Sequence, residues 1–163
     1  MSKVERKKQQ VIEKVAQHLV VNGLTDVGLR TLAAVSDTSD RMLIYYFGTI
    51  DALLGEAMQV LAATLAQQLD AALGEHRRPA ATLLQEVAAL SGSPDFMPVI
   101  QLWFEIVGLA VRGQSPYAEN AAAVAANWHA WVASRIEEEE QATAVFAQIE
   151  GRLMVSLIGM KLE

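Results

Sequence analysis

The fold of this chain is decided by residues 28–54, which read GLRTLAAVSDTSDRMLIYYFGTIDALL. Two short apolar patterns lie in this stretch, and the polar residues Ser-Asp-Thr-Ser at positions 36–39 separate them. Such side chains compete with the backbone for hydrogen bonds and favour a turn. Because Ser39 is also a good N-cap, the pattern predicts two short helices, residues 28–35 and 40–47, joined by a four-residue turn.

Apolar residues recur at helical spacing on both sides of this helix pair. Before it, a helix over residues 4–22 is expected to end at Gly23, because glycine adopts the left-handed conformation without a Cβ clash. After it, breaks that contain glycine, proline or a run of glutamates separate the remaining helices. These span residues 51–73, 80–91, 96–113, 117–136 and 141–160. The sequence therefore predicts an all-α fold, with an N-terminal three-helix helix-turn-helix domain over residues 1–50 and a C-terminal helical bundle over residues 51–163.

The composition limits the class of protein. The 163 residues are 52% hydrophobic and include no cysteine, which excludes disulfides and thiolate metal sites and favours the reducing cytoplasm. The charged N-terminus is not followed by the apolar segment of a signal peptide. The longest apolar stretch, Met97–Val111, contains Pro98, Gln101 and Glu105 and is too short and too polar to span a bilayer. A cytoplasmic protein that does not cross a membrane is therefore expected.

The charges are distributed unevenly along the chain. Residues 1–55 hold seven basic and six acidic side chains, whereas the remainder holds six basic and thirteen acidic ones. The net charge of −6 argues against a protein that coats nucleic acid without sequence preference. The asymmetry instead indicates an N-terminal part that can approach phosphate and a C-terminal part that cannot.

Specific residues connect the helix pair to a known family. They are Leu32-Ala33, Ser39 in the turn, the run Leu43–Phe47, the stretch Asp51–Leu54, and Asn22-Gly23 at the end of the first helix. With their spacing intact, these residues resemble the N-terminal signature of TetR-family transcriptional regulators. The resemblance covers residues 8–58, and beyond it only Ile149–Leu153 is similar to a short motif on that family's final helices.

Several positions depart from the family signature. The turn glycine of the family aligns with Asp37, a residue type that tolerates unusual backbone angles. A lysine that commonly opens the fourth helix and meets phosphate aligns with Ile50, so that this chain lacks one positive contact. The further departures are Gly28, Thr38, Arg41 and Ile44.

The resemblance implies that the helix over residues 40–47 enters the major groove of double-stranded DNA, where its N-terminal residues meet base edges. Arg41 is suited to donate two parallel hydrogen bonds to guanine. Asp40 either accepts a hydrogen bond from cytosine or only stabilises the start of the helix. The candidates for base contacts are Thr38, Ser39, Asp40, Arg41 and Met42.

Other residues are expected to meet phosphate, which positions the protein without reading sequence. Tyr45 and Tyr46 would present their hydroxyls to phosphate, although the alternative for one of them is a place in the core. Arg30 lies near the start of the second helix. A cluster at the N-terminus forms either a basic arm beside the DNA or a solvated helix end, and it consists of Lys3, Arg6, Lys7 and Lys8.

The resemblance also implies a homodimer and, often, a small-molecule pocket in the C-terminal domain. An apolar stripe on the last helix is interpreted as the dimer interface, although it would equally suit the core of a single chain. The stripe consists of Val145, Ile149, Leu153 and Leu157, with Met160 at its end. A small apolar or aromatic effector would occupy the pocket, unless the pocket residues are plain core. These residues are Met58, Met97, Trp103, Phe104, Trp128 and Trp131.

No constellation of residues indicates catalysis. The three histidines, His18, His76 and His129, have no metal-ligand spacing, and the glutamates at 137–140 point around a helix instead of forming a pair. No cofactor, bound metal or enzymatic activity is therefore expected. The resemblance favours a ligand-responsive repressor that acts as a homodimer on a palindromic operator. The alternative is a helical dimer that binds partner proteins and has weakened or lost DNA binding.

Overall fold

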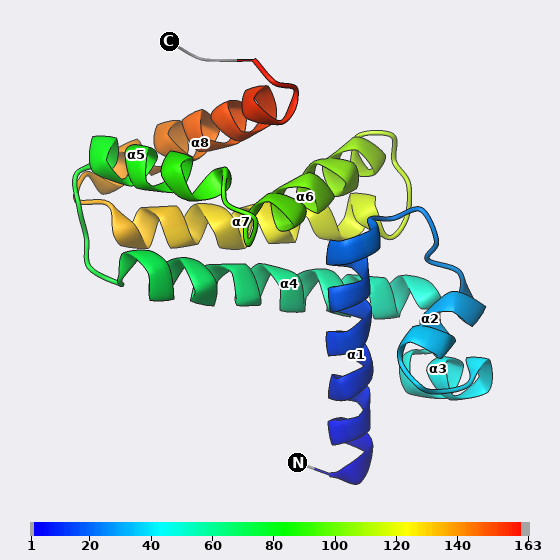
Figure 1. Cartoon of the computed structure of the whole chain (residues 1–163). Helices are drawn as coiled ribbons and strands as arrows, with labels where there is room; N and C mark the ends of the chain where they lie inside the picture. Colours follow the sequence, from blue (N-terminus) through cyan, green and yellow to red (C-terminus); the bar gives the residue numbers. More distant parts are fainter. Residues whose placement is uncertain (1, 161–163) are drawn as a thin grey trace.

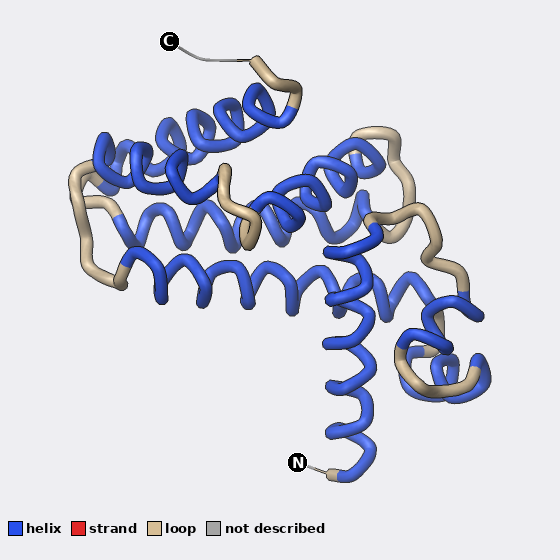
Figure 2. Tube along the Cα trace, in the orientation of Figure 1, coloured by secondary structure: helices blue, strands red, loops and turns tan. Residues whose placement is uncertain are grey.

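A computed structural model describes residues 2–160, and in this part of the chain helices are joined by loops and turns, with no strand (Figure 2). Its elements are α1 (Lys3–Asn22), α2 (Leu29–Val35), α3 (Asp40–Phe47), α4 (Ile50–Leu73), α5 (Ala80–Ser91), α6 (Met97–Ala110), α7 (Tyr117–Arg135), the 3-10 turn η1 (Glu139–Gln141) and α8 (Ala142–Leu157). The predicted all-α fold is confirmed. The largest differences are at the ends of α6 and α8, where left-handed glycines, Gly113 and Gly159, follow the helices.

The helices form two parts that share α4 (Figure 1). Helices α4, α5, α6, α7 and α8 form a bundle, in which α7 packs between α4, α6 and α8. Helix α1 crosses α4 steeply and also contacts α6. The short helices α2 and α3 lie beside α1 at the N-terminal end of α4, outside the bundle. This arrangement leaves α3 open to solvent on the side away from the core.

The caps of the helices follow from the local sequence. The hydroxyl of Ser2 accepts a hydrogen bond from the backbone N–H of Glu5, and the Glu5 carboxylate accepts one from the Ser2 backbone in return. Ser39 and Thr49 accept the corresponding bonds at the starts of α3 and α4. Gly48, with φ +76°, closes α3 in a left-handed conformation that other residues rarely adopt. Helix α3 is thus fixed at both ends by its own sequence.

The first hydrophobic cluster crosses the boundary that we place at residue 50. It joins α1, α2 and α3 to the start of α4 and to α6 and α7, and its fully buried members include Val15, Leu32 and Leu53. Leu102 of α6 belongs to the same cluster. The second cluster lies in the bundle, between α4, α5, α6, α7 and α8. The two parts share a hydrophobic core. We therefore propose the division into residues 1–50 and 51–163 on the basis of function and not of separate packing.

The stripe on α8 is part of the second cluster, which corrects the prediction that it forms the dimer interface. Val145, Ile149 and Leu153 are 2%, 2% and 8% exposed, and Leu157 is half-buried against them. Helices α5 and α7 of the same chain cover this face of α8. The apolar periodicity was therefore that of a core, and these side chains are not available to a second copy. Met160, at the end of the stripe, is exposed.

Among residues 2–160, no single helix is both long and apolar enough to cross a membrane, although α3 and α4 pass as a pair bent by 71°. Within the same residues, no group of three or more histidine, aspartate or glutamate side chains is placed to hold a metal ion.

Candidate nucleic-acid interface and internal cavity

The turn between α2 and α3 is held from both sides. Ser36 is buried, and its hydroxyl donates to the carbonyl of Leu32. Asp37 takes the left-handed conformation with φ +50°, in the position of the family's turn glycine. Its carboxylate is bonded to the ammonium group of Lys14 on α1, and this hydrogen bond and the charge of Lys14 lower the pKa of Asp37. Asp37 therefore preserves the turn in place of the family's glycine, and its bond to Lys14 links the turn to α1.

Helix α3 has an inner and an outer face. Leu43 and Phe47, four residues apart, are 2% and 9% exposed and pack into the first cluster. On the outer side Arg41 is exposed, and Tyr45 is 70% exposed. Tyr46 instead packs against the first cluster, with its ring 6.2 Å from that of Phe47. The structure thus places one tyrosine outward and the other partly in the core.

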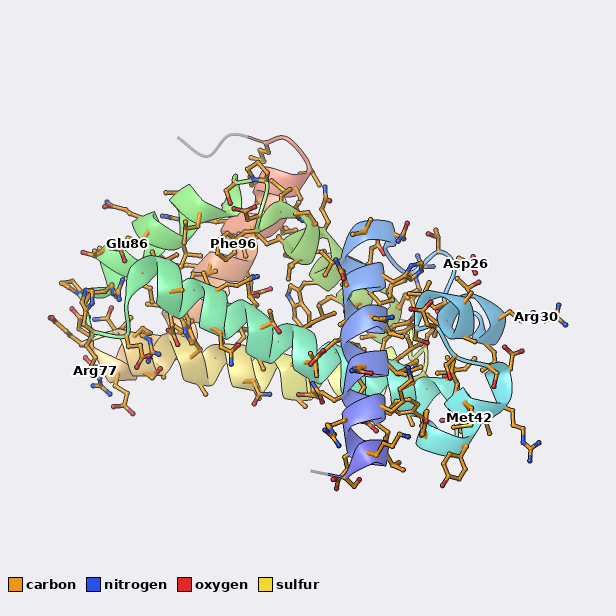
Figure 3. The ribbon with its side chains drawn as sticks, turned by 60° about the horizontal axis from the view of Figure 1, so that its bottom comes forward. Asp26, Arg30, Met42, Arg77, Glu86 and Phe96 are labelled. Atoms are coloured by element: carbon orange, nitrogen blue, oxygen red, sulfur yellow. The ribbon has the colours of Figure 1, made fainter. Side chains whose placement is uncertain are left out.

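The other candidate residues lie around the outer face of α3. Ser39 is exposed, whereas Thr38, Asp40 and Met42 are half-buried. In Figure 3, Arg30 of α2 extends away from the molecule on the side where Met42 lies. The candidates for base contacts and Arg30 are therefore brought together at one end of the molecule.

The N-terminal basic residues divide into two groups. Lys8 lies with its ammonium group 4.9 Å from the centre of the Phe47 ring and 3.7 Å from the Glu56 carboxylate, so that it holds α1 on α3 and α4. Lys3 and Arg6 are exposed and Lys7 is half-buried, and within the described residues none of the three forms an ion pair. The arm that we expected is thus reduced to these three side chains.

The bundle contains a cavity of about 270 Å³ that is partly open to solvent. Four of the six predicted pocket residues line it, namely Met58, Trp103, Trp128 and Trp131. Met97 and Phe104 do not, and for these two the prediction was wrong. On α6 the cavity faces Val99, Ile100, Leu102, Trp103 and Ile106, one side of a helix with 3.6 residues per turn. Phe104 follows Trp103 by about 100° and packs elsewhere in the second cluster.

Most of the residues that line the cavity were not predicted, and one of these, Glu150, is an acid. Glu150 of α8 accepts the indole N–H of Trp103 at 2.8 Å through Oε2 and that of Trp128 at 3.0 Å through Oε1. Burial raises the pKa of Glu150, and the two indole donors oppose this effect. In the sequence, the sign of this role was an acidic residue directly after Ile149 of the apolar stripe.

Helix α6 connects the cavity to the helix-turn-helix part. Trp103 faces the cavity, and two residues later the Glu105 carboxylate accepts the backbone N–H of Leu24 at 2.9 Å. Gly23 has φ +67°, and a Cβ atom there would lie 2.8 Å from a Glu105 oxygen. The loop between α1 and α2 therefore packs closely on α6, and a displacement of α6 would also displace that loop.

Comparison with known proteins gives no match in sequence but several in structure. No protein-family model matches the chain, and no curated protein is recognisably similar to it in sequence. A solved structure from Rhodococcus sp., described as a TetR-family transcriptional regulator, superposes with a TM-score of 0.72 at 17% identity, over 97% of this chain and 90% of that one. The chain has the TetR fold. The multidrug binding protein EbrR in complex with proflavin superposes with a TM-score of 0.68 at 22% identity, over 94% and 91%.

A solved structure from Streptomyces coelicolor A3(2), described as a transcriptional regulator, superposes with a TM-score of 0.73 at 21% identity, over 91% of this chain and 86% of that one. The departures from the TetR signature have local explanations in this chain. Ile50 packs against the first cluster, so that an apolar contact stands where the family places a charge. Gly28 caps α2 without a side-chain hydrogen bond. The TetR fold is therefore kept although these positions differ.

Proposed function

We propose that this chain is a sequence-specific, DNA-binding transcriptional regulator. The observation that carries the proposal is the outer face of α3, where Arg41 and Tyr45 stand free while Leu43 and Phe47 hold the helix on the core. A helix presented in this way fits the major groove. Arg41 is at its N-terminal end, where a guanidinium can donate two bonds to guanine, a contact worth about 1–3 kcal/mol of discrimination.

Phosphate contacts would position α3 in the groove. Tyr45 and Arg30 are exposed, and both can reach a DNA backbone on either side of α3. Ser39 accepts the cap bond from Met42 through its oxygen, so that its hydroxyl proton remains for a phosphate. Asp40 supports the first turn of α3, where a negative charge is favourable.

We further propose that the protein is a homodimer, with an interface on the solvent side of α7 and α8. Helix α7 exposes a row of small residues at four-residue spacing, Ala118, Ala122, Ala126 and Ala130. Helix α8 exposes Met154 and Ile158, which are 49% and 74% exposed. Small residues let helices approach closely, and large apolar ones gain from burial against a second copy. Met154→Glu would give monomers in sedimentation velocity, whereas Ala89→Glu on α5 would leave the dimer intact.

The cavity would hold an effector that controls DNA binding. The solved structures of EbrR contain proflavin and imidazole, and the cavity here suits a small apolar or aromatic molecule. Such a molecule would shift α6, and Glu105 would carry the shift to the loop before α2. An effector acts only through different affinities for the DNA-binding and the released state. We propose that the protein is a cytoplasmic repressor that the effector releases from its operator.

Selection of duplexes from a random DNA pool by the purified protein tests the proposed function. Arg41→Ala is compared with Arg77→Ala, because Arg77 lies on the loop at the far end of the bundle and forms only an exposed ion pair with Glu139 (Figure 3). We expect a palindromic site with half-sites about 34 Å apart, or a multiple of that distance. Arg41→Ala would relax one position per half-site, and Arg77→Ala would select the wild-type site.

If no duplex is enriched at low salt, the protein does not read DNA. The helical dimer that binds partner proteins is then the interpretation that remains.

A further inference from the structure

The wall of the cavity carries a single ionisable side chain among the described residues. Gln59, Ser91 and Asn127 are polar but neutral, and the remaining lining residues except Glu150 are apolar or aromatic. A carboxylate in such surroundings is costly unless an opposite charge or several hydrogen bonds compensate for it. The presence of Glu150 in this wall therefore requires an explanation.

No positive group of the protein compensates Glu150. Within the described residues, no lysine, arginine or histidine nitrogen lies within 4.0 Å of its oxygens. Each oxygen accepts one indole N–H, from Trp103 and Trp128, although a carboxylate has about four acceptor positions. The raised pKa of Glu150 agrees with a carboxylate that is partly desolvated and has no cation beside it.

The aromatic side chains around Glu150 are suited to a cation. The two indoles meet the carboxylate with their N–H edges, Trp131 stacks on Trp128 with ring centres 4.8 Å apart, and the guanidinium of Arg135 already lies 5.7 Å from the centre of the Trp131 ring. Positive charge is attracted to aromatic faces, and most strongly to those of tryptophan. A carboxylate and aromatic faces in one apolar wall attract the same class of ligand.

We propose that the effector is a small organic cation whose positive charge pairs with the Glu150 carboxylate and whose apolar body lies among Trp103, Trp128 and Trp131. This inference rests on the proposed effector site and specifies its ligand. The cavity volume of about 270 Å³ lies just below the range of about 300–1,000 Å³ for ligand pockets, which favours a molecule of one or two rings. An anionic effector would be repelled by the unpaired carboxylate.

Three probes of similar shape and different charge test the proposal. They are N-methylquinolinium, which is permanently positive, neutral 1-methylnaphthalene, and the anion 1-naphthoate. Binding to the full chain is measured by isothermal titration calorimetry at pH 7.5, with quenching of tryptophan fluorescence as a second readout. We expect the cation to bind at least about tenfold more tightly than either of the other probes, which corresponds to about 1.4 kcal/mol.

Substitution of Glu150 separates charge pairing from a bracing role for the two indoles. Glu150→Gln would abolish the preference for the cation and leave the affinity for 1-methylnaphthalene nearly unchanged. The control is Glu119→Gln, which removes the same charge from an exposed position in the first turn of α7 and would keep the preference. The comparison of probes on the wild-type chain decides the proposal even if Glu150→Gln fails to fold.

The outcomes are distinguishable from those that concern the proposed function. If the cation and the neutral probe bind the wild-type chain equally, the effector site stands and the inference about its ligand is wrong. A cation preference that survives Glu150→Gln also overturns it. If none of the three probes binds, both the inference and the effector site fail, whereas duplex selection decides on DNA binding independently.

Discussion

The helix-turn-helix end and the bundle of this molecule differ in how their interiors are packed. Around α3, buried leucines pack into the first cluster, and the polar side chains of the turn are capped or paired. In the bundle, large side chains surround a cavity of about 270 Å³. Unfilled apolar volume lowers stability, so that a chain keeps it where the space has a use. We infer that the first region is the platform for the proposed DNA-binding helix and that the second contains the proposed effector site.

The two regions also hold carboxylates with opposite electrostatic environments. At the turn, Lys14 lowers the pKa of Asp37, because a cation is supplied by the protein itself. In the cavity, burial raises the pKa of Glu150, because no protein cation accompanies it. The first charge is already paired within the fold, and we infer that the second is paired by a ligand. The predictions below test the contrast between these regions.

The largest expected effect comes from one substitution made in both regions. Leu32 of α2 is fully buried in the first cluster and does not line the cavity, and Leu32→Ala would lower the free energy of unfolding by about 2–5 kcal/mol. Leu65 is half-buried, packs against the second cluster and faces the cavity, so that Leu65→Ala removes fewer contacts and would cost about half as much or less. Chemical denaturation of the two variants measures the difference. Equal losses would contradict the contrast in packing.

A smaller effect is expected at the contact between the two regions. Gly23→Ala introduces a side chain at φ +67° and close to Glu105, and we expect it to lower the free energy of unfolding by about 1–2 kcal/mol. The matched control is Gly108→Ala in the last turn of α6, where a Cβ atom has no neighbour within 4 Å. That change would raise stability by up to about 1 kcal/mol. Thermal unfolding that gives the same sign for both would exclude a close fit between α6 and the loop.

The smallest effect concerns the ion pair of the turn. Because the pKa of Asp37 is lower in the folded chain than its ordinary 3.8, the pair stabilises the fold above that pH. This contribution is lost as the pH falls through the lowered value. The free energy of unfolding of the wild type would therefore fall more steeply below about pH 4 than that of Lys14→Gln. Both side chains are exposed and their interaction is screened by salt, so the expected difference is small. Parallel curves of unfolding free energy against pH would show that the ion pair does not stabilise the fold.

The sequence predicted local structure well because the signals for it are local. Helix ends follow from caps such as Ser39 and from glycines such as Gly48, whose requirements do not depend on distant residues. The TetR signature extends over one continuous stretch, so that its match also needed no tertiary information. Each predicted helix was therefore found with its ends displaced by three residues or fewer.

The errors arose where packing between helices decides. Apolar periodicity marks the face of α8 that contains Val145 and Ile149 as buried, but it does not say whether the same chain or a second copy covers it. Phe104 and Trp103 are neighbours of similar character, and only the rotation of α6 about its axis determines which one meets the cavity. The role of Glu150 depends on three helices at once, and no pattern within α8 contains that information.

The central claim is that α3 reads DNA sequence, and equilibrium titration tests it most directly. Fluorescence anisotropy would compare the duplex selected by the protein with a scrambled duplex of the same composition, over a series of salt concentrations. We predict that the selected duplex binds at least about 10³-fold more tightly. Its affinity would fall with a log–log salt slope near −5, as for about six neutralised phosphates. Equal affinity for the two duplexes would contradict the claim.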